Sequence, residues 1–460
     1  MEIASILSLT LLLVIAITEL VYLGYHVCIA SASSRYLSPK GYISSAPVVA
    51  FHIPIRGESP ALLERVLASI RQQRYPRDKI KVVIVCDDQD PKPMEEVCNR
   101  ARRDLEVIFI HRRTATGFKA GALNEALKVQ SDVIVVLDVD SVLPSDFLMK
   151  VLTTLYESND VAAVVARWEP LNLRESAVSE AIGFGQKFFT NGLFKGLQVI
   201  FGSSILLGNA CAIRRNALLR VGMWDEKCLL EDVELGVRLR LKGYRIVYNS
   251  DVPVWVEHPS TYSDFKRQQK RWAYGISQVL LKHGKAIIKS NLRMLEKVSL
   301  LIYLTQYWGL ALAGLSIIAL PLLTFFNGEP SLLPMLPLMT IGAVITMIYS
   351  FNFMRHTIEE CNLSRRIKLL GRSAALALAM SFDLFLSSLK PLFKVPCTWR
   401  VTPKGPLKKT SKAVPKLELG LSILPLSALV VAMLKSYVVL SLWSLACLAP
   451  LIYVTLKRFG

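Results

Sequence analysis

The stretch DVIVVLDVDS at residues 132–141 decides the fold of the first half of the chain. Five apolar residues stand in a row between aspartates. A short apolar run bounded by polar residues is typical of a strand that is buried on both faces of a parallel sheet. This strand ends in Asp138 and Asp140, and such sheets bind ligands at the carboxyl ends of their strands. The stretch therefore predicts a buried strand with two carboxylates at the binding edge.

Similar apolar runs lie on both sides of this stretch. They are VVAFHIPI, KVVIVC and LEVIFIH before it and VAAVVA after it. The segment 58–74, between the first two runs, has its apolar residues at helical spacing. Alternation of strand and helix predicts a doubly wound α/β domain with a mostly parallel sheet, which we expect over residues 45–297.

The composition adds a membrane component. The chain has 460 residues, a net charge of +19 and 52% hydrophobic residues, and its mean hydropathy is +0.39. So apolar a chain with so many basic residues favours a membrane protein with a basic cytoplasmic side. No base-reading motif or basic repeat is present, so we expect no nucleic-acid partner. The eight cysteines are scattered without a C-x-x-C pair, which excludes a disulfide framework and a zinc-finger pattern.

Apolar stretches predict five membrane spans. Residues 1–32 are expected to be a retained transmembrane helix, residues 298–352 two more, and residues 417–456 the last two. The basic loop 353–369 and the basic segment 391–416 both fall on the cytoplasmic side only if the less apolar segment 370–390 is an interfacial helix. Mixed apolar and basic residues also predict interfacial helices near 180–201 and 273–297, against the alternative of ordinary domain helices.

Carboxylates follow two of the predicted strands. Asp87 and Asp88 come directly after KVVIVC, and Asp138 and Asp140 form an Asp-x-Asp turn. Such a turn can direct oxygen ligands at one Mg²⁺ or Mn²⁺ ion, which also binds phosphate oxygens and neutralises a diphosphate leaving group. The alternative is that these aspartates cap the next helix.

Two more motifs carry charged residues. Lys119 in TGFKAGALNEAL could reach a donor phosphate as a point charge, although a solvated lysine is the simpler interpretation. Glu231 and Asp232 in LLED precede an amphipathic pattern, where one carboxylate in a partly dry site could act as a general base. Helix capping is the alternative for this pair.

The motif QQKRW and the loop WRVTPKG complete the set. Gln268 and Trp272 are spaced i, i+4 and share a helix face, where the tryptophan ring could stack on a sugar and Arg271 could bind phosphate. A core tryptophan with solvated charges is the alternative. The loop at 399–405 could close over a phosphorylated ligand, or it could be a plain linker.

Taken in order, Asp-Asp, Lys-Ala-Gly, Asp-x-Asp, Glu-Asp and Gln-x-x-Arg-Trp resemble the inverting family 2 membrane glycosyltransferases of the cellulose synthase, cellulose-synthase-like and hyaluronan synthase group. The resemblance covers residues 47–297 and extends through WRVTPKG, which is similar to the gating loop of cellulose synthases. The chain departs from the family in IPIRGE, where an Asn commonly precedes the Glu, and in the Trp-led form of the gating motif.

The resemblance implies a role for each matching residue. The implied donor contacts are Pro54, Glu58, Asp87, Asp88, Lys119, Asp138, Arg271, Thr402 and Lys404. The implied acceptor contacts are Glu231, Gln268 and Trp272, the metal ligands are Asp138 and Asp140, and the catalytic base is Asp232.

These observations together predict a hexosyltransferase that is integral to the cytoplasmic membrane, with its catalytic domain in the cytoplasm. The resemblance implies a UDP-sugar donor, a Mg²⁺ or Mn²⁺ cofactor and a growing β-linked polysaccharide as acceptor, with product export and accessory or oligomeric membrane partners. One alternative is the transfer of one or a few sugars to a lipid acceptor. Others are a transporter or channel with a nucleotide-sensing domain, and a catalytically silent scaffold.

Overall fold

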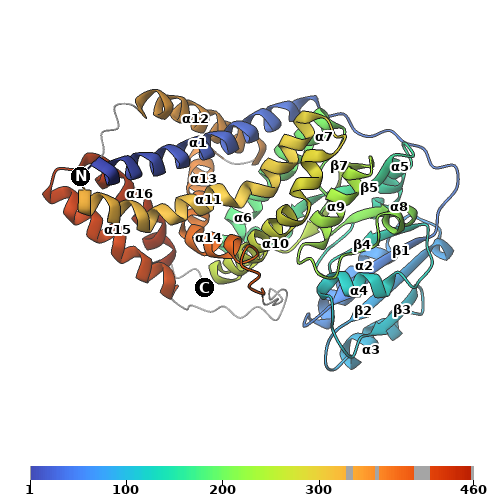
Figure 1. The fold of residues 1–460 in the computed structure, drawn as a ribbon. Coiled ribbons are helices and arrows are strands. Elements are labelled where there is room, and N and C mark those ends of the chain that lie inside the picture. The colour runs from blue at the N-terminus through green and yellow to red at the C-terminus, as the bar shows by residue number, and fades with distance from the viewer. Residues whose placement is uncertain (1, 328–334, 358–361, 398–414, 457–460) are drawn as a thin grey trace.

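A computed structural model describes residues 2–327, 335–357, 362–397 and 415–456 of the chain. Figure 1 shows a seven-stranded sheet flanked by helices, beside a bundle of long helices. Helices α9 (Glu231–Leu241) and α10 (Tyr262–Lys289) contact each other where these two parts meet. The α/β domain with a helical membrane-type region is therefore the observed architecture.

The sheet contains all five strands that the sequence predicts. In chain order the strands are β1 (Val49–Ile55), β2 (Ile80–Cys86), β3 (Glu106–His111), β4 (Val133–Val136), β5 (Val161–Pro170), β6 (Cys211–Arg214) and β7 (Arg245–Val256). Their order across the sheet is β3-β2-β1-β4-β6-β5-β7. All neighbours are parallel except β6, which runs antiparallel to β4 and β5. The mostly parallel sheet is confirmed, and β6 and β7 are additions that no predicted run covered.

Helices cover both faces of the sheet, which explains why its central strands β1, β2 and β4 are largely apolar. Phe51 and Ile53 of β1 join a buried cluster with α2 (Pro60–Arg71), α3 (Lys92–Ala101) and α5 (Phe147–Leu155). Ala50, on the opposite face, packs with α4 (Phe118–Ala126). The strand order reverses between β1 and β4, so a crevice is expected at the carboxyl ends of these strands.

The segment between β5 and β7 is largely helical. It contains α6 (Ala177–Phe188), a π-helical stretch (Phe189–Phe194), α7 (Lys195–Phe201), α8 (Arg215–Arg220) and α9. Residues 273–297, expected to be one interfacial helix, are instead the end of α10 and the start of α11, with a break at 290–293. Ile288, Met294 and Leu295 are exposed around this break. Contact of these regions with a bilayer stays a prediction.

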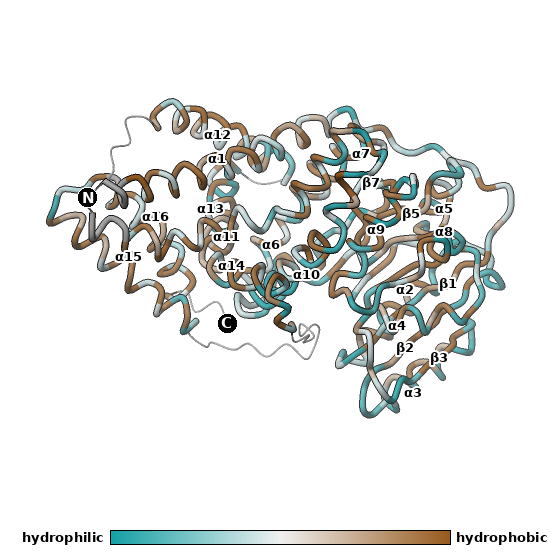
Figure 2. The backbone as a smooth tube through the Cα atoms, viewed as in Figure 1, coloured by the Kyte–Doolittle hydropathy of each residue, from teal (hydrophilic) through white to brown (hydrophobic). Residues whose placement is uncertain are grey.

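The second part of the molecule is a bundle of apolar helices. They are α1 (Glu2–Ala32), α11 (Met294–Asn327), α12 (Leu336–Thr357), α13 (Leu363–Ala379), α14 (Ser381–Leu389), α15 (Lys416–Leu434) and α16 (Val438–Leu456). Figure 2 shows hydrophobic residues along α1, α11, α12, α15 and α16. In the described part of the chain, four helices are long and apolar enough to cross a membrane, namely α1, α11, α12 and α15.

Two segments differ in form from the expectation. The expected interfacial helix at 370–390 is a pair, α13 and α14, bent by 45° at Met380; counted as one broken span, this pair would be a fifth. The expected last span corresponds to α16. Its stretch Leu440–Leu456 is apolar but shorter than the four helices that could cross a membrane.

Close packing of α11 on α14 yields a testable stability prediction. A Cβ atom on Gly314 of α11 would stand 2.4 Å from the carbonyl carbon of Ser381 at the start of α14. Because backbone must move to admit it, Gly314→Ala is expected to destabilise the protein by about 1–3 kcal/mol. Thermal unfolding in detergent checks this against Gly371→Ala, where a Cβ meets no atom within 4 Å. Equal melting temperatures for the two variants would contradict this packing.

Candidate active site

The first group of predicted site residues lies where β1 and β2 end. The Asp87 carboxylate accepts a hydrogen bond of 2.6 Å from Nε of Arg112 and a second one from the same guanidinium. Asp88 accepts a hydrogen bond from the backbone N–H of Gly57. Glu58 accepts one from the backbone N–H of Arg56, just beyond Pro54 of β1. The four predicted nucleotide contacts on this side thus gather at one edge of the sheet.

Lys119 is the centre of the second group. It lies in the first turn of α4, and its Nζ donates to Asp138 Oδ1 at 2.8 Å and to the Gly208 carbonyl at 2.6 Å. Glu231 Oε1 is 3.8 Å away. Burial alone would lower the pKa of Lys119. The carboxylates of Asp138, Glu231 and Asp232 outweigh this effect and raise the pKa of Lys119 above its ordinary value. The interpretation as a solvated lysine is therefore wrong.

A buried asparagine holds the turn that presents Asp138. Asn209 Oδ1 accepts from the backbone N–H of Asp138 at 2.9 Å and from the Ser141 hydroxyl at 3.0 Å. Trp168 Nε1 in turn donates to the Asn209 carbonyl at 3.0 Å. Asn209 is only 4% exposed, so its position is set by the surrounding core.

Glu231 and Asp232 begin α9 and face Lys119. Burial raises the pKa of Glu231, and Lys119 acts in the opposite direction. Burial likewise raises the pKa of Asp232 against the effect of Lys119 and of backbone N–H donors. A Cβ on Gly208 would come within 2.9 Å of Asp232 Oδ2, so this loop approaches the carboxylate closely. A carboxylate with a raised pKa beside a cation is suited to accept a proton near neutral pH.

Helix α10 adds a cation to this group. Arg271 interacts with Glu231, Asp138 and Asp232, and burial lowers its pKa while these carboxylates oppose the shift. Gln268 and Trp272 flank it on the same helix and are half-buried. Cys397, the last described residue before 398–414, lies close enough to Arg271 for the two side chains to interact electrostatically. The predicted Thr402 and Lys404 lie outside the described residues.

Asp140 has a different set of partners. Its side chain is buried, Oδ2 accepts from the backbone N–H of Glu257 at 3.3 Å, and its carbonyl accepts from Arg65 at 3.0 Å. Within the described residues no three His, Cys, Asp or Glu side chains are grouped so that they could hold a metal ion. Asp138 and Asp140 offer two carboxylates, which suits a Mg²⁺ or Mn²⁺ ion that takes its remaining ligands from phosphate and water.

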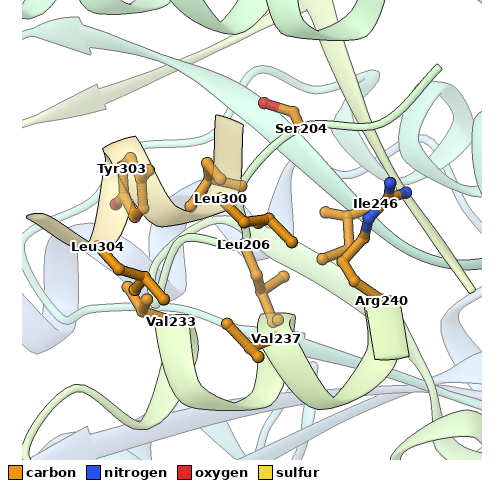
Figure 3. Close-up of a pocket in the computed structure, with 11 residues that line it drawn as sticks. Ser204, Leu206, Val233, Val237, Arg240, Ile246, Leu300, Tyr303 and Leu304 are labelled. Atoms are coloured by element: carbon orange, nitrogen blue, oxygen red, sulfur yellow. The ribbon is translucent and has the colours of Figure 1, made fainter. Parts of the chain in front are cut away.

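A long apolar helix packs directly on the helix that carries the acids. Tyr303 and Leu304 of α11 and Val233 and Val237 of α9 line one cavity, which Figure 3 shows with the α11 side chains facing those of α9. Tyr303 also lies within electrostatic reach of Asp232. The candidate site therefore touches both parts of the molecule.

Sequence reasoning missed two residues of this edge. Arg112 bonds Asp87 and also donates to the Thr116 carbonyl at 2.9 Å, so it connects the first group to the loop before Lys119. Asn209 was missed because its partners are 71 and 68 positions away in the chain. A polar residue in the otherwise apolar run SSILLGNACAI was the available signal.

Comparison with known proteins shows that this chain is similar to glycosyltransferases. The family described as "Glycosyltransferase like family 2" matches residues 46–275. A "Probable glycosyltransferase" of Sulfolobus acidocaldarius is 27% identical over 428 residues, which cover 90% of each chain. "Glucomannan 4-beta-mannosyltransferase 1" of Oryza sativa subsp. japonica is 29% identical over 259 residues, which cover 54% of this chain and 49% of the relative. The chain thus matches about half the length of the plant relative.

One solved structure shares the fold along most of the chain. It is the mannosyltransferase PcManGT from Pyrobaculum calidifontis, solved with GDP-Man and Mn²⁺. The TM-score is 0.55 at 20% identity, and the match covers 85% of this chain and 99% of the other. At this identity the likeness concerns the arrangement of the elements.

Proposed function

The chain belongs to the family 2 glycosyltransferases, and from this premise we propose that it is a membrane-bound, inverting mannosyltransferase. Its donor is a nucleotide-activated mannose, and its acceptor is the end of a growing β-linked polysaccharide at the cytoplasmic face of the membrane. The observation that carries the proposal is the partly buried Lys119, which contacts Asp138 and Gly208 and stands 3.8 Å from Glu231. Cations and carboxylates lie together there at the carboxyl edge of a mostly parallel sheet. The cations can stabilise a diphosphate leaving group, and a carboxylate can accept a proton.

The proposed reaction is a single displacement at the anomeric carbon. Asp232 accepts the proton of the acceptor hydroxyl, whose oxygen attacks the carbon from the side opposite the diphosphate. The new C–O bond forms as the bond to phosphate breaks, so the configuration inverts. The nucleoside diphosphate leaves with the electron pair, and Lys119 and Arg271 stabilise its charge. Trp272 and Gln268 hold the acceptor sugar beside Asp232.

The donor's nucleotide and diphosphate are proposed to bind along the edge from β2 to β4. Pro54, Glu58, Asp87 and Asp88 bound the nucleotide side, and Asp138 and Asp140 would hold the metal. A bound Mg²⁺ or Mn²⁺ would neutralise charge on the leaving diphosphate. The two carboxylates fit such an ion because phosphate oxygens can complete its coordination.

The membrane part of the proposal rests on the four to five candidate spans and on the basic residues of the sequence segments 353–369 and 391–416. Basic residues collect on the cytoplasmic side of membrane proteins, which leaves the catalytic domain there. Thr402 and Lys404, which lie outside the described residues, are proposed to contact the donor, because Cys397, the last described residue before them, lies near Arg271.

The sugar is proposed from the plant relatives, which are named glucomannan 4-beta-mannosyltransferases. A second candidate acceptor is a membrane lipid that receives one or a few sugars. It is favoured by the direct packing of α11, a candidate span, on the helix that carries Asp232. Mass spectrometry of products made in nanodiscs from GDP-mannose separates the two: a ladder of sugar additions supports the polymer, and one glycolipid supports the lipid acceptor.

Replacing Lys119 gives a pH-dependent prediction. Lys119 lowers the pKa of both Glu231 and Asp232. Its removal in Lys119→Met lets burial raise the pKa of Asp232 further, so the base is protonated at a higher pH. The acid limb of kcat against pH is therefore expected to move to higher pH, and the donor KM to rise about tenfold or more.

The measurement is a pH series at saturating donor, compared with Lys128→Met. Lys128 lies on the surface with Glu125 as its partner, so its loss should leave the pH profile unchanged. An acid limb that stays in place in Lys119→Met would contradict the proposed contact between Lys119 and the base.

A further inference from the structure

Helix α10 presents two different faces. One face carries Arg271, which interacts with the carboxylates of the candidate site, and Gln268 and Trp272 lie beside it on the helix. A second stripe follows helical spacing along the same turns and points to the apolar bundle: Tyr262, Lys266, Gln269, Lys270 and Ala273. The two stripes interleave in the sequence, so any shift of the helix on the bundle would also move the acceptor-side residues.

The second stripe holds a buried charge cluster, defined here as Lys266, Lys270, Asp383 and Glu418. Lys266 Nζ is 3.1 Å from Asp383 Oδ2 and 2.6 Å from Glu418 Oε1. Lys270 Nζ is 2.5 Å from Asp383 Oδ1. The Tyr262 hydroxyl donates to Glu418 Oε1 at 2.8 Å.

This cluster is electrically balanced, and its two carboxylates are buried, while Lys270 is 39% exposed. Asp383 is 5% exposed and Glu418 1% exposed. Two cations face two carboxylates, and burial of ions is tolerated only when each keeps its partner in good geometry. Because water hardly reaches Asp383 and Glu418, their bonds to the lysines constrain the position of α10.

The cluster connects three elements that are far apart in the sequence. Asp383 belongs to α14 and Glu418 to the first turn of α15, a candidate span. Gln269 adds a bond to the α11 side chain Tyr307 at 2.8 Å. Around them Tyr262 and Ala273 pack with Leu376, Met380 and Leu384. Helix α10 is therefore joined by polar bonds to α11, α14 and α15 and by apolar packing to α13.

We propose that the buried charge cluster is a positioning device that fixes α10 on the helical bundle and so sets where Gln268 and Trp272 hold the acceptor. The residues of the cluster are positioning residues, since they act through α10. The inference rests on the proposed function for its acceptor-side readout, and the position of α10 itself can be measured without any activity.

The test uses the full-length protein in nanodiscs and four variants. Lys266→Met leaves the buried Glu418 without its cationic partner, and Asp383→Asn leaves Lys270 without its carboxylate partner. Asp383→Glu is the conservative variant, because it keeps a carboxylate opposite both lysines. Arg267→Gln is the matched control, because Arg267 lies on the same helix but pairs with Asp264 at the surface.

Three quantities are measured for each variant. They are the affinity for GDP with Mn²⁺, the transfer rate against the concentration of a β-linked manno-oligosaccharide with GDP-mannose as donor, and amide hydrogen exchange over residues 262–277. In Lys266→Met and Asp383→Asn we expect the oligosaccharide KM to rise about tenfold, with GDP affinity unchanged and faster exchange confined to α10 and its contacts. Asp383→Glu should keep much of the wild-type KM, and Arg267→Gln should match the wild type.

The outcomes separate this inference from the proposed function. Unchanged exchange in α10 for both single variants would overturn the inference, and so would equal losses in GDP affinity and oligosaccharide KM, which indicate general destabilisation. If the wild type transfers no sugar, the proposed function fails, and faster exchange in α10 alone still supports the positioning role.

Discussion

Asp232→Asn is expected to lower the turnover number at least about a hundredfold, while nucleotide affinity stays within about twofold. The amide keeps the size of the side chain and its position at the start of α9. It cannot accept the acceptor's proton. Loss of turnover without loss of donor binding is the signature of a group that acts in the transition state.

The measurement combines single-turnover transfer with calorimetric binding of the nucleotide. Asp104→Asn is the matched control, because Asp104 is an exposed carboxylate that pairs with Arg71 at the other end of the sheet. Turnover above a hundredth of the wild type in Asp232→Asn would exclude Asp232 as the base. Weaker nucleotide binding together with slow turnover would indicate a structural role instead.

Asp140→Asn is expected to abolish the dependence of nucleotide binding on Mn²⁺ and to weaken binding in its presence by about tenfold or more. Asp140 is 1% exposed and accepts a hydrogen bond from the backbone of Glu257, so its carboxylate is held by the fold. An amide can keep that bond but offers the ion no charge. Asp138 would then be the one remaining carboxylate of the proposed pair of ligands, so we expect this single substitution to weaken metal-dependent binding.

The check is a titration of GDP and UDP with and without Mn²⁺, in the wild type, in Asp140→Asn and in the Asp104→Asn control. Equal affinities with and without the ion in the wild type would contradict the metal role of Asp138 and Asp140. A melting temperature of Asp140→Asn close to that of the wild type is needed to exclude unfolding as the cause.

The sequence was sufficient for the strands whose signal is local. β1, β2 and β4 are buried on both faces and are largely apolar, and the carboxyl ends of β2 and β4 carry Asp87, Asp88 and Asp138 at one edge, as parallel pairing requires. β6, Cys211–Arg214, lies within the longer stretch ILLGNACAIR, in which no polar residue directly before Cys211 marks where a strand begins. Its antiparallel direction depends on the long connection that precedes it.

The parts of the site that were not predicted depend on long-range partners. Lys119 is surrounded by small residues in the sequence, and its burial follows from Gly208 and Asp138, which lie 89 and 19 positions away. Arg112 has its partner Asp87 at a separation of 25 residues. The second face of α10 could be seen as a stripe, but its acidic partners Asp383 and Glu418 lie over a hundred residues further along the chain.

The central claim is tested most directly by incubating the purified protein in lipid nanodiscs with Mn²⁺ and GDP-mannose, UDP-glucose or UDP-N-acetylglucosamine in turn. Release of nucleoside diphosphate is recorded together with the mass of any product. The account predicts GDP release from GDP-mannose, a product that grows in steps of one hexose, and neither in Asp232→Asn. Folded wild-type protein that binds nucleotide but releases no diphosphate from any of these donors, with a polysaccharide or a lipid acceptor present, would contradict it.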